Sequence, residues 1–218
     1  LAEVVVTLVL EESLVKSRER VKSYGEVFTP RHMVDRMLDL VANELEGPGF
    51  VDKTFLEPSA GEGNFLVAIL QRKLAAVEKA FEPNLWPQES LFALASIYGI
   101  ELLEDNHQEA KAAMLETFVD FHRSHGTVCH AGTKLHRAAV FLIDTNIVQG
   151  NTLTALDANG REIHFSWWHR VPGVPGAVQR EVFRFASLRE ESMFDFTAYD
   201  SYAVCQIDQA HHEMRTHV

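Results

Sequence analysis

A glycine turn between a short strand and a long helix is the feature that most restricts how this chain can fold. The run "VDKTFLEP" from Val51 to Pro58 predicts a strand that its proline ends. "SAGEGN" follows as a tight turn, and the next segment predicts a helix. The apolar positions of that helix fall on one face: Phe65, Leu66, Ile69, Leu70, Leu74, Val77 and Phe81. Strand, turn and helix in this order predict the first unit of an α/β fold.

The same alternation continues through the middle of the chain. "LFALASIYGIE" predicts a short helix and a second strand that ends at Glu101, and residues 105–123 predict another helix. A helix over residues 135–143 then leads to a third strand, "NIVQG". Strands and helices at this spacing predict a Rossmann-like, doubly wound, mostly parallel sheet.

The segments on either side of this core differ from it. Before it, Thr29 and Pro30 suit the start of a helix whose inward face is predicted to hold Met33, Val34, Met37, Leu38, Val41 and Leu45. After it, "REIHFSWWHRV" and "QREVFRFASL" alternate like strands around a "VPGVPG" turn. The length of 218 residues predicts a single domain. Its parts are an N-terminal helical lead (1–50), a core (51–153) and an atypical, short β-rich tail (154–218).

Composition and charge limit the compartment and the partners. With 46% hydrophobic and 23% charged residues, the chain is typical of a soluble globular protein. Its apolar start, "LAEVVVTLVL", is too short for a membrane span and predicts a packed helix or strand. The only two cysteines, Cys129 and Cys205, give no disulfide framework, so a cytoplasmic location is expected. A net charge of −11 argues against a chain that grips duplex DNA by itself.

The glycine turn is suited to a ligand with both an amine and a carboxylate. Gly61 and Gly63 let the backbone approach a ligand, and the N–H groups of the following helix face an anion. A dinucleotide fingerprint needs a third glycine where Leu66 stands, so dinucleotides are disfavoured. Glu57, just before the turn, would repel a pyrophosphate but attract an ammonium group.

The residues at the end of the second strand indicate that the ligand also contains a nucleoside. Either Glu101 merely begins a loop, or its carboxylate accepts both hydroxyls of a ribose. Leu102 beside it would give an adenine an apolar wall. An amino acid, a ribose and an adenine together describe S-adenosylmethionine.

Four motifs in order carry a resemblance to a known family. "GEVFTP", "FLEPSAGEGNFL", "YGIELLEDN" and "NIVQGNTL" resemble motifs of the adenine-N6 DNA methyltransferases that place the cofactor motif before the catalytic one. The resemblance covers Tyr24 to Leu153 and implies S-adenosylmethionine as cofactor and DNA as substrate. It also implies a restriction-modification or phage-related system, with a specificity or restriction protein as partner.

The resemblance further implies which residues contact the cofactor. They are Phe28, Thr29, Pro30, Glu57, Pro58, Ser59, Ala60, Gly61, Gly63, Asn64, Phe65, Glu101, Leu102, Asn151 and Thr152. Asn151 stands where the family commonly has an acidic residue that reaches the adenine amino group. Its amide can accept from that group and donate to a ring nitrogen.

The catalytic motif of the family is missing. These enzymes need an "Asn or Asp, Pro, Pro, aromatic" loop after the fourth strand to hold a flipped base. Beyond Pro87 the only prolines are Pro172 and Pro175, and they are not adjacent. Substitutes in "SWWHRV" and "FDFTAYDSY" are Trp167, Trp168, His169, Asp195, Tyr199, Asp200 and Tyr202. Two hypotheses stay open: a methyltransferase with an atypical or partner-supplied loop, or a non-catalytic cofactor-binding subunit or fragment that acts through protein partners.

A histidine-rich stretch raises a metal site as an alternative. "HRSHGTVCHAGTKLH" brings His122, His125, Cys129, His130 and His136 close in sequence. Structural zinc sites prefer paired cysteines, so a solvated loop without metal is expected there. His211, His212 and His217 are expected in an exposed tail.

Overall fold

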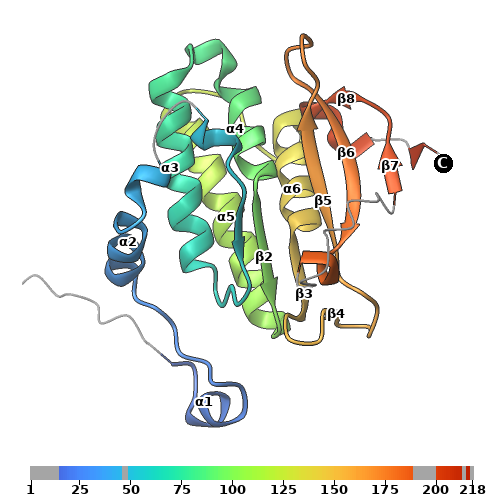
Figure 1. Ribbon diagram of the computed structural model, residues 1–218. Coiled ribbons are helices and arrows are strands. Elements are labelled where there is room, and N and C mark those ends of the chain that lie inside the picture. Colours follow the sequence, from blue (N-terminus) through green and yellow to red (C-terminus); the bar gives the residue numbers. More distant parts are fainter. Residues whose placement is uncertain (1–14, 46–48, 189–199, 213–214, 217–218) are drawn as a thin grey trace, which may run out of the picture.

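The computed structural model describes residues 15–45, 49–188 and 200–212, and the backbone of 215–216 (Figure 1). Six α-helices are described: α1 Arg18–Tyr24, α2 Arg31–Asp39, α3 Asn64–Ala80, α4 Trp86–Ala95, α5 Glu104–Ser124 and α6 Lys134–Asn146. The strands are β1 Phe55–Glu57, β2 Ile97–Glu101, β3 Ile147–Asn151, β4 Leu156–Asp157, β5 His164–Arg170, β6 Ala177–Arg184, β7 Asp200–Tyr202, β8 Cys205–Gln206 and β9 Arg215–Thr216. Short 3-10 helices are η1 Ala42–Glu44, η2 Phe50–Asp52, η3 Pro83–Leu85, η4 Phe185–Leu188 and η5 Ile207–His212.

The strands form two sheets. One has the order β1-β2-β3-β4, in which β1, β2 and β3 are parallel and β4 is antiparallel. The other is a five-stranded antiparallel sheet built around β6. The prediction of an α/β chain with a mostly parallel sheet is confirmed. The sequence predicted two strand-like segments in the short β-rich tail, and the structure has five paired strands there, β5 to β9.

Both faces of the parallel sheet are covered. Helices α3 and α5 lie on one side of it, and α6 and β5 lie on the other (Figure 1). Gly99 of β2 faces α3, because a Cβ there would lie 3.1 Å from a methyl group of Leu66. Tyr98 points to the opposite face, where its hydroxyl donates to the carbonyl of Ser166 at 2.6 Å. Its ring also meets Phe165 edge-on at 5.3 Å. Successive side chains of β2 point to opposite faces of the sheet. The side chain of Tyr98 therefore connects the parallel sheet to β5 of the antiparallel sheet.

Among the described strands, the parallel sheet follows the order of the sequence, β1-β2-β3, without a reversal. A doubly wound sheet reverses its strand order at one point. Among the described strands, β1 pairs with β2 alone and stands at the end of the sheet. β1 is also shorter than predicted, since residues 50–52 form η2 instead of extending the strand.

Helix α2 buries less than its sequence pattern predicted. Only Val34 and Leu38 are buried, whereas Met33, Met37 and Val41 are about half exposed. The helix ends at Asp39 and packs against α3 along one narrow stripe, so the outer part of its apolar face stays in solvent. The wide inward face predicted for this segment is wrong.

A fully buried lysine ties helix α3 to the segment before β1. The Nζ atom of Lys73 donates to the carbonyls of Phe50 at 2.9 Å, Val51 at 3.0 Å and Lys53 at 2.6 Å. Burial lowers the pKa of Lys73 to about 7, and nearby Asp52 opposes that shift. The three bonds fix the approach of the chain into β1.

The β5–β6 hairpin follows its predicted pattern. The two strands pair from His164 opposite Arg184 to Arg170 opposite Val178, and "VPGVPG" forms the turn. Trp168 points inward and donates its ring N–H to the side-chain oxygen of Asn146 at 3.0 Å. Trp167 points the other way. Of the helices that the structure describes, none has the length and apolar character needed to cross a membrane.

Candidate functional site

The carboxyl ends of β1, β2 and β3 meet around the glycine turn. The N–H of Ala60 in this turn donates to the carbonyl of Ile100 at the end of β2, at 2.9 Å. On the other side, the hydroxyl of Thr152 after β3 donates to the carbonyl of Pro58. The turn after the first strand is therefore held from both sides. Ligands of open parallel sheets bind at this edge.

Both glycines of the turn have backbone conformations that favour glycine. Gly61 has a φ of 56° and Gly63 a φ of 97°. A Cβ on Gly63 would lie 2.9 Å from the Cα of Ala110 in α5, which no side chain tolerates. A Cβ on Gly61 would lie 3.5 Å from the ring of Phe28. Gly63 thus lets two helices approach each other, while Gly61 faces the N-terminal lead.

Glu101 joins the loops that follow β1 and β2. One carboxylate oxygen accepts from the N–H of Gly61 at 2.7 Å, and the other accepts from the N–H of Leu103 at 2.9 Å. The residue is only 5% exposed. A carboxylate has about four acceptor positions, so each oxygen retains one for a ligand hydroxyl. Glu101 thus joins the end of β2 to the glycine turn, and its contact with a ribose stays a prediction.

A second acid and a helix end stand beside it. Glu57 accepts from the N–H of Ser59 at 3.0 Å, and burial raises the pKa of its carboxyl while that hydrogen bond lowers it. Helix α3 begins after Gly63, which provides no side-chain cap. The first N–H groups of a helix lack partners within it and attract anions. The start of α3 and the carboxylate of Glu57 therefore lie at the same corner of the sheet.

The "GEVFTP" segment lies against the turn. Phe28 is buried over Gly61, and the carbonyl of Thr29 accepts from the side-chain amide of Asn64 at 3.1 Å. Pro30 occupies the N-cap position of α2, one residue later than the cap expected at Thr29, and no side chain caps this helix. Residues far apart in sequence, from the lead and from α3, are thus brought together, and their contacts with a cofactor stay predictions.

A charged cluster that the sequence analysis missed holds the lead in place. Arg20 of α1 binds Glu26 through two contacts of 2.6 Å and Asp105 of α5 at 2.7 Å. The buried side chain of Asn106 donates to Glu26 at 2.6 Å. Arg20 is the main reason why the pKa of Glu26 is lowered. Only the mixture of charges in "KSRERVKSYGE" hinted at these contacts.

Asn151 uses part of its side chain within its own turn. Its Oδ1 atom accepts from the N–H groups of Leu153 at 2.8 Å and Thr154 at 3.2 Å. Both lone pairs of that oxygen are then engaged. The Nδ2 group is left to donate to a ligand. Asn151 was expected to accept from the adenine amino group and to donate to a ring nitrogen. With Oδ1 engaged, the donated hydrogen bond fits this geometry better than the accepted one.

The remaining predicted positions differ in exposure. Leu102 is exposed, as are Pro58 and Ser59 on the outside of the turn. Ala60 is buried, and Phe65 is partly buried against the core. Their contacts with a cofactor stay predictions.

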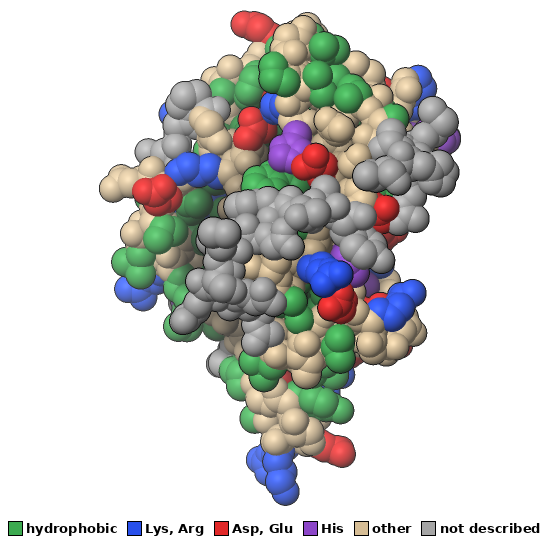
Figure 2. Space-filling view, turned by 45° about the vertical axis from the view of Figure 1, so that its right-hand side comes forward, with side chains coloured by type: hydrophobic (Ala, Val, Ile, Leu, Met, Phe, Trp, Pro, Cys, Tyr) green, Lys and Arg blue, Asp and Glu red, His purple; other side chains and the backbone are tan. Residues whose placement is uncertain are grey.

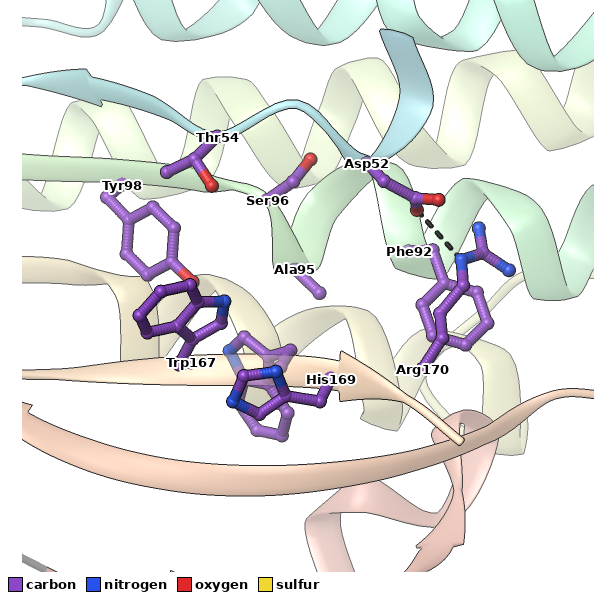
Figure 3. A pocket seen from close by; sticks show the side chains of 10 residues that line it. Asp52, Thr54, Phe92, Ala95, Ser96, Tyr98, Trp167, His169 and Arg170 are labelled. Carbon is purple, nitrogen blue, oxygen red and sulfur yellow. Dashed lines mark hydrogen bonds and ion pairs between the residues drawn. The ribbon is translucent and has the colours of Figure 1, made fainter. Parts of the chain in front are cut away.

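The tryptophan and histidine of "SWWHRV" lie away from this corner. Trp167 and His169 line a cavity of about 260 Å³ with Asp52, Thr54 and Ser96 (Figure 3). Those three residues precede β1 and β2, so the cavity is at the opposite ends of the strands from Glu57 and Glu101. The segment cannot serve as a base platform at the glycine turn from there.

The second proposed substitute, "FDFTAYDSY", falls partly in the antiparallel sheet. Tyr202 of β7 lies under the guanidinium of Arg180, 4.6 Å from its carbon to the ring centroid. Asp200 pairs with Val182 in the β6–β7 ladder. Asp195 and Tyr199 lie outside the described residues, as does the predicted element "LAEVVVTLVL".

The histidines are dispersed among separate partners. His122 is buried against the hydroxyl of Ser90 at 2.9 Å, and burial lowers its pKa to about 4. His125 contacts Glu78 at 3.2 Å. Within the described ranges, no three His, Cys, Asp or Glu side chains gather as metal ligands would. His211 is half-buried in η5, which corrects the expectation of an exposed tail at that residue.

Comparison with known proteins finds the type II methyltransferase M.PaeR7I of Pseudomonas aeruginosa. It is 37% identical over 91 residues, which cover 42% of this chain and 15% of that enzyme. The chain therefore spans about 15% of the length of this curated relative. No family model and no solved structure matches the chain. Part of the chain is thus distantly similar to a type II methyltransferase.

Proposed function

We propose that this chain binds S-adenosylmethionine at the glycine turn and is the cofactor-binding part of an adenine-N6 DNA methyltransferase. The observation that carries the proposal is the Glu101 carboxylate, buried at the end of β2 and bonded to the N–H of Gly61. In this position, beside a glycine turn and a helix N-terminus, the carboxylate would accept the hydroxyls of a ribose. The partial similarity to a type II methyltransferase supports the same function.

The groups at this corner match the parts of the cofactor. Glu101 would accept the ribose hydroxyls, and Leu102 would lie against the adenine. Glu57 would attract the ammonium group, while the first N–H groups of α3 would bind the carboxylate. Phe28 would cover the ligand from the lead. When bound, the cofactor supplies an activated methyl group on its sulfonium.

The residues that would hold the methyl acceptor, an adenine in DNA, are less completely represented in this chain than those that would hold the cofactor. The sequence contains no "Asn or Asp, Pro, Pro, aromatic" motif, which in the family holds a flipped base. Figure 2 shows acidic and basic side chains interspersed on the face it displays, without a continuous basic patch among the described residues in that view. With a net charge of −11, the chain would bind DNA weakly alone. The second candidate function, a non-catalytic cofactor-binding subunit or fragment in the cytoplasm, is favoured by these two observations.

Replacing the proposed ribose acceptor tests cofactor binding. Glu101→Gln should weaken S-adenosylmethionine by about 1–3 kcal/mol, because charge-assisted hydrogen bonds to the hydroxyls are lost. Isothermal titration calorimetry measures this, and Glu104→Gln is the matched control because Glu104 is exposed nearby at the start of α5. A thermal unfolding curve of each variant shows whether the turn itself survives. Unchanged affinity in a folded Glu101→Gln protein would remove Glu101 from the site.

A methyl-transfer assay separates the two candidate functions. Chain and radiolabelled cofactor are incubated with mixed-sequence duplex DNA, and incorporation into adenine is counted. Transfer supports the methyltransferase with its own atypical loop. Binding without transfer supports the cofactor-binding subunit or fragment.

A further inference from the structure

The "GEVFTP" segment alternates between buried and exposed side chains as it crosses from α1 to α2 (Figure 1). The side chain of Glu26 is 7% exposed, and Phe28 is 8% exposed. Val27 between them is 59% exposed. Glu26 and Phe28 therefore face the protein from the same side of the segment. A movement of Glu26 would move Phe28, whose ring lies over Gly61.

The carboxylate of Glu26 is bound by residues of two helices. Arg20 of α1 donates to it through two N–H groups at 2.6 Å each, and the Nδ2 group of Asn106 in α5 donates to it at 2.6 Å. Asn106 is 1% exposed, and its Oδ1 atom accepts from Arg20 at 3.3 Å. Its amide fits in one orientation only, because its donor faces a carboxylate and its acceptor faces a guanidinium. Arg20, Glu26 and Asn106 are called the Glu26 network below.

The ion pairs that also join the lead to α5 are more exposed than this network. Asp105 accepts from Arg20 at 2.7 Å and from Lys16 at 3.2 Å, but its side chain is 47% exposed. Exposed ion pairs contribute little to stability, because water and salt screen them. The position of the lead therefore depends mainly on the buried contact between Glu26 and Asn106.

A buried carboxylate with three donated hydrogen bonds has two favourable arrangements. Either all three bonds are made, or the segment leaves α5 and water hydrates Glu26. An intermediate position would keep the charge buried without its donors, which is costly. The lead is thus joined to α5 by an element with two discrete states, closed and open.

We propose that Glu26 and Asn106 are positioning residues for the cofactor: their hydrogen bond holds Phe28 over Gly61 and thereby sets the affinity for S-adenosylmethionine. This role rests on the proposed function. A ligand that contacts Phe28 binds the closed state, so its apparent dissociation constant rises by the factor by which the closed fraction falls. By the same linkage, bound cofactor stabilises the closed state.

Asn106→Asp changes one group of the network at nearly constant volume. A carboxylate would then face that of Glu26 in place of a donor, and two adjacent carboxylates repel each other near neutral pH. We expect S-adenosylmethionine to bind about tenfold more weakly in isothermal titration calorimetry, as for a tenfold smaller closed fraction. Gln108→Glu is the matched control, because it adds the same charge at an exposed position of the same helix. Equal affinities of the two variants would overturn the proposal.

Reversal of donor and acceptor tests the hydrogen bond itself. Asn106→Asp combined with Glu26→Gln puts the acceptor on α5 and the donor on the lead, and it keeps the total charge of the wild type. We expect the double variant to bind the cofactor several times more tightly than Asn106→Asp alone, because residues in contact do not act additively. Binding as weak as that of Asn106→Asp, or weaker, would show that this bond does not position the lead.

Hydrogen exchange shows whether the lead is the part that moves. The backbone N–H groups of residues 25–29 should exchange faster in Asn106→Asp than in the wild type, while those of α3 keep their rate. Saturating cofactor should slow the exchange of residues 25–29 in the wild type. Weaker binding without faster exchange of this segment would overturn the proposal, as would faster exchange without weaker binding.

A second variant keeps the test valid if Asn106→Asp does not fold. Glu26→Gln changes the lead instead of the buried helix and removes the charge that Arg20 binds. It should also weaken the cofactor and speed the exchange of residues 25–29. Glu19→Gln is its control, since Glu19 is exposed in the first turn of α1. Equal affinities of these two variants would count against the proposal in the same way.

The wild type in the same titrations keeps the two proposals apart. No binding of S-adenosylmethionine by the wild type would end the proposed function and this positioning role together. Binding that neither Asn106→Asp nor Glu26→Gln weakens would end the positioning role alone.

Discussion

Gly63→Ala should destabilise the protein by about 2–5 kcal/mol and abolish S-adenosylmethionine binding. The added Cβ would lie 2.9 Å from the Cα of Ala110, so α3 and α5 would have to separate. The φ of 97° adds a backbone cost for any residue with a side chain. Urea unfolding measures the loss of stability, and calorimetry measures the loss of binding.

Gly160→Ala is the matched control for this substitution. Gly160 has a φ of 76°, and no atom lies within 4 Å of the place where its Cβ would be. Its replacement should cost only the backbone term, about 1–2 kcal/mol, and leave cofactor binding intact. Equal losses of stability in the two variants would show that the contact with α5 contributes nothing.

Lys73→Met should destabilise the protein by about 2–4 kcal/mol, because buried carbonyls lose their donor. The carbonyls are those of Phe50, Val51 and Lys53, at 2.9, 3.0 and 2.6 Å from the Nζ atom. Urea unfolding at pH 7 measures the difference. Lys79→Met is the control, since Lys79 is exposed in the last turn of the same helix and should change stability little.

The pH dependence of the same pair of proteins tests the state of Lys73. Its pKa is about 7 in the folded protein, against 10.5 in the unfolded chain. Between these values the unfolded chain binds more protons, so the wild type should gain stability relative to Lys73→Met as pH rises from 7. The gain is at most about 1.4 kcal/mol per pH unit. Parallel curves up to pH 9.5 would mean that three carbonyls keep Lys73 charged.

Local features of the site could be predicted from the sequence because they depend on neighbours in the chain. Gly61 and Gly63 mark a turn whose geometry needs glycine. Glu101 is the only charged residue of its strand and stands at the end of it. Parallel strands bring such ends to one edge, so the meeting of Gly61 with Glu101 followed from topology. The approach of Phe28 to the turn followed from the family resemblance alone.

Features that depend on long-range packing could not be predicted. Lys73 occupies an inward position of α3. The helical periodicity of the sequence cannot show that three backbone carbonyls before β1 accept hydrogen bonds from its Nζ atom. Met33 and Met37 satisfy the helical pattern, but how much of α2 is covered depends on what packs against it. Which strands pair with β1, among the described residues β2 alone, depends on the arrangement of the whole sheet.

The bridge that Glu101 makes between the loops after β1 and β2 has a thermodynamic consequence. Since the carboxylate already accepts hydrogen bonds from the N–H groups of Gly61 and Leu103, the two loops are preorganised and do not move independently of each other. A ligand that reaches this corner would lose little affinity to the ordering of loops. Selectivity among ligands would then depend on their shape. Carboxylate oxygens held in fixed positions accept only ligands whose hydroxyl groups have the matching spacing.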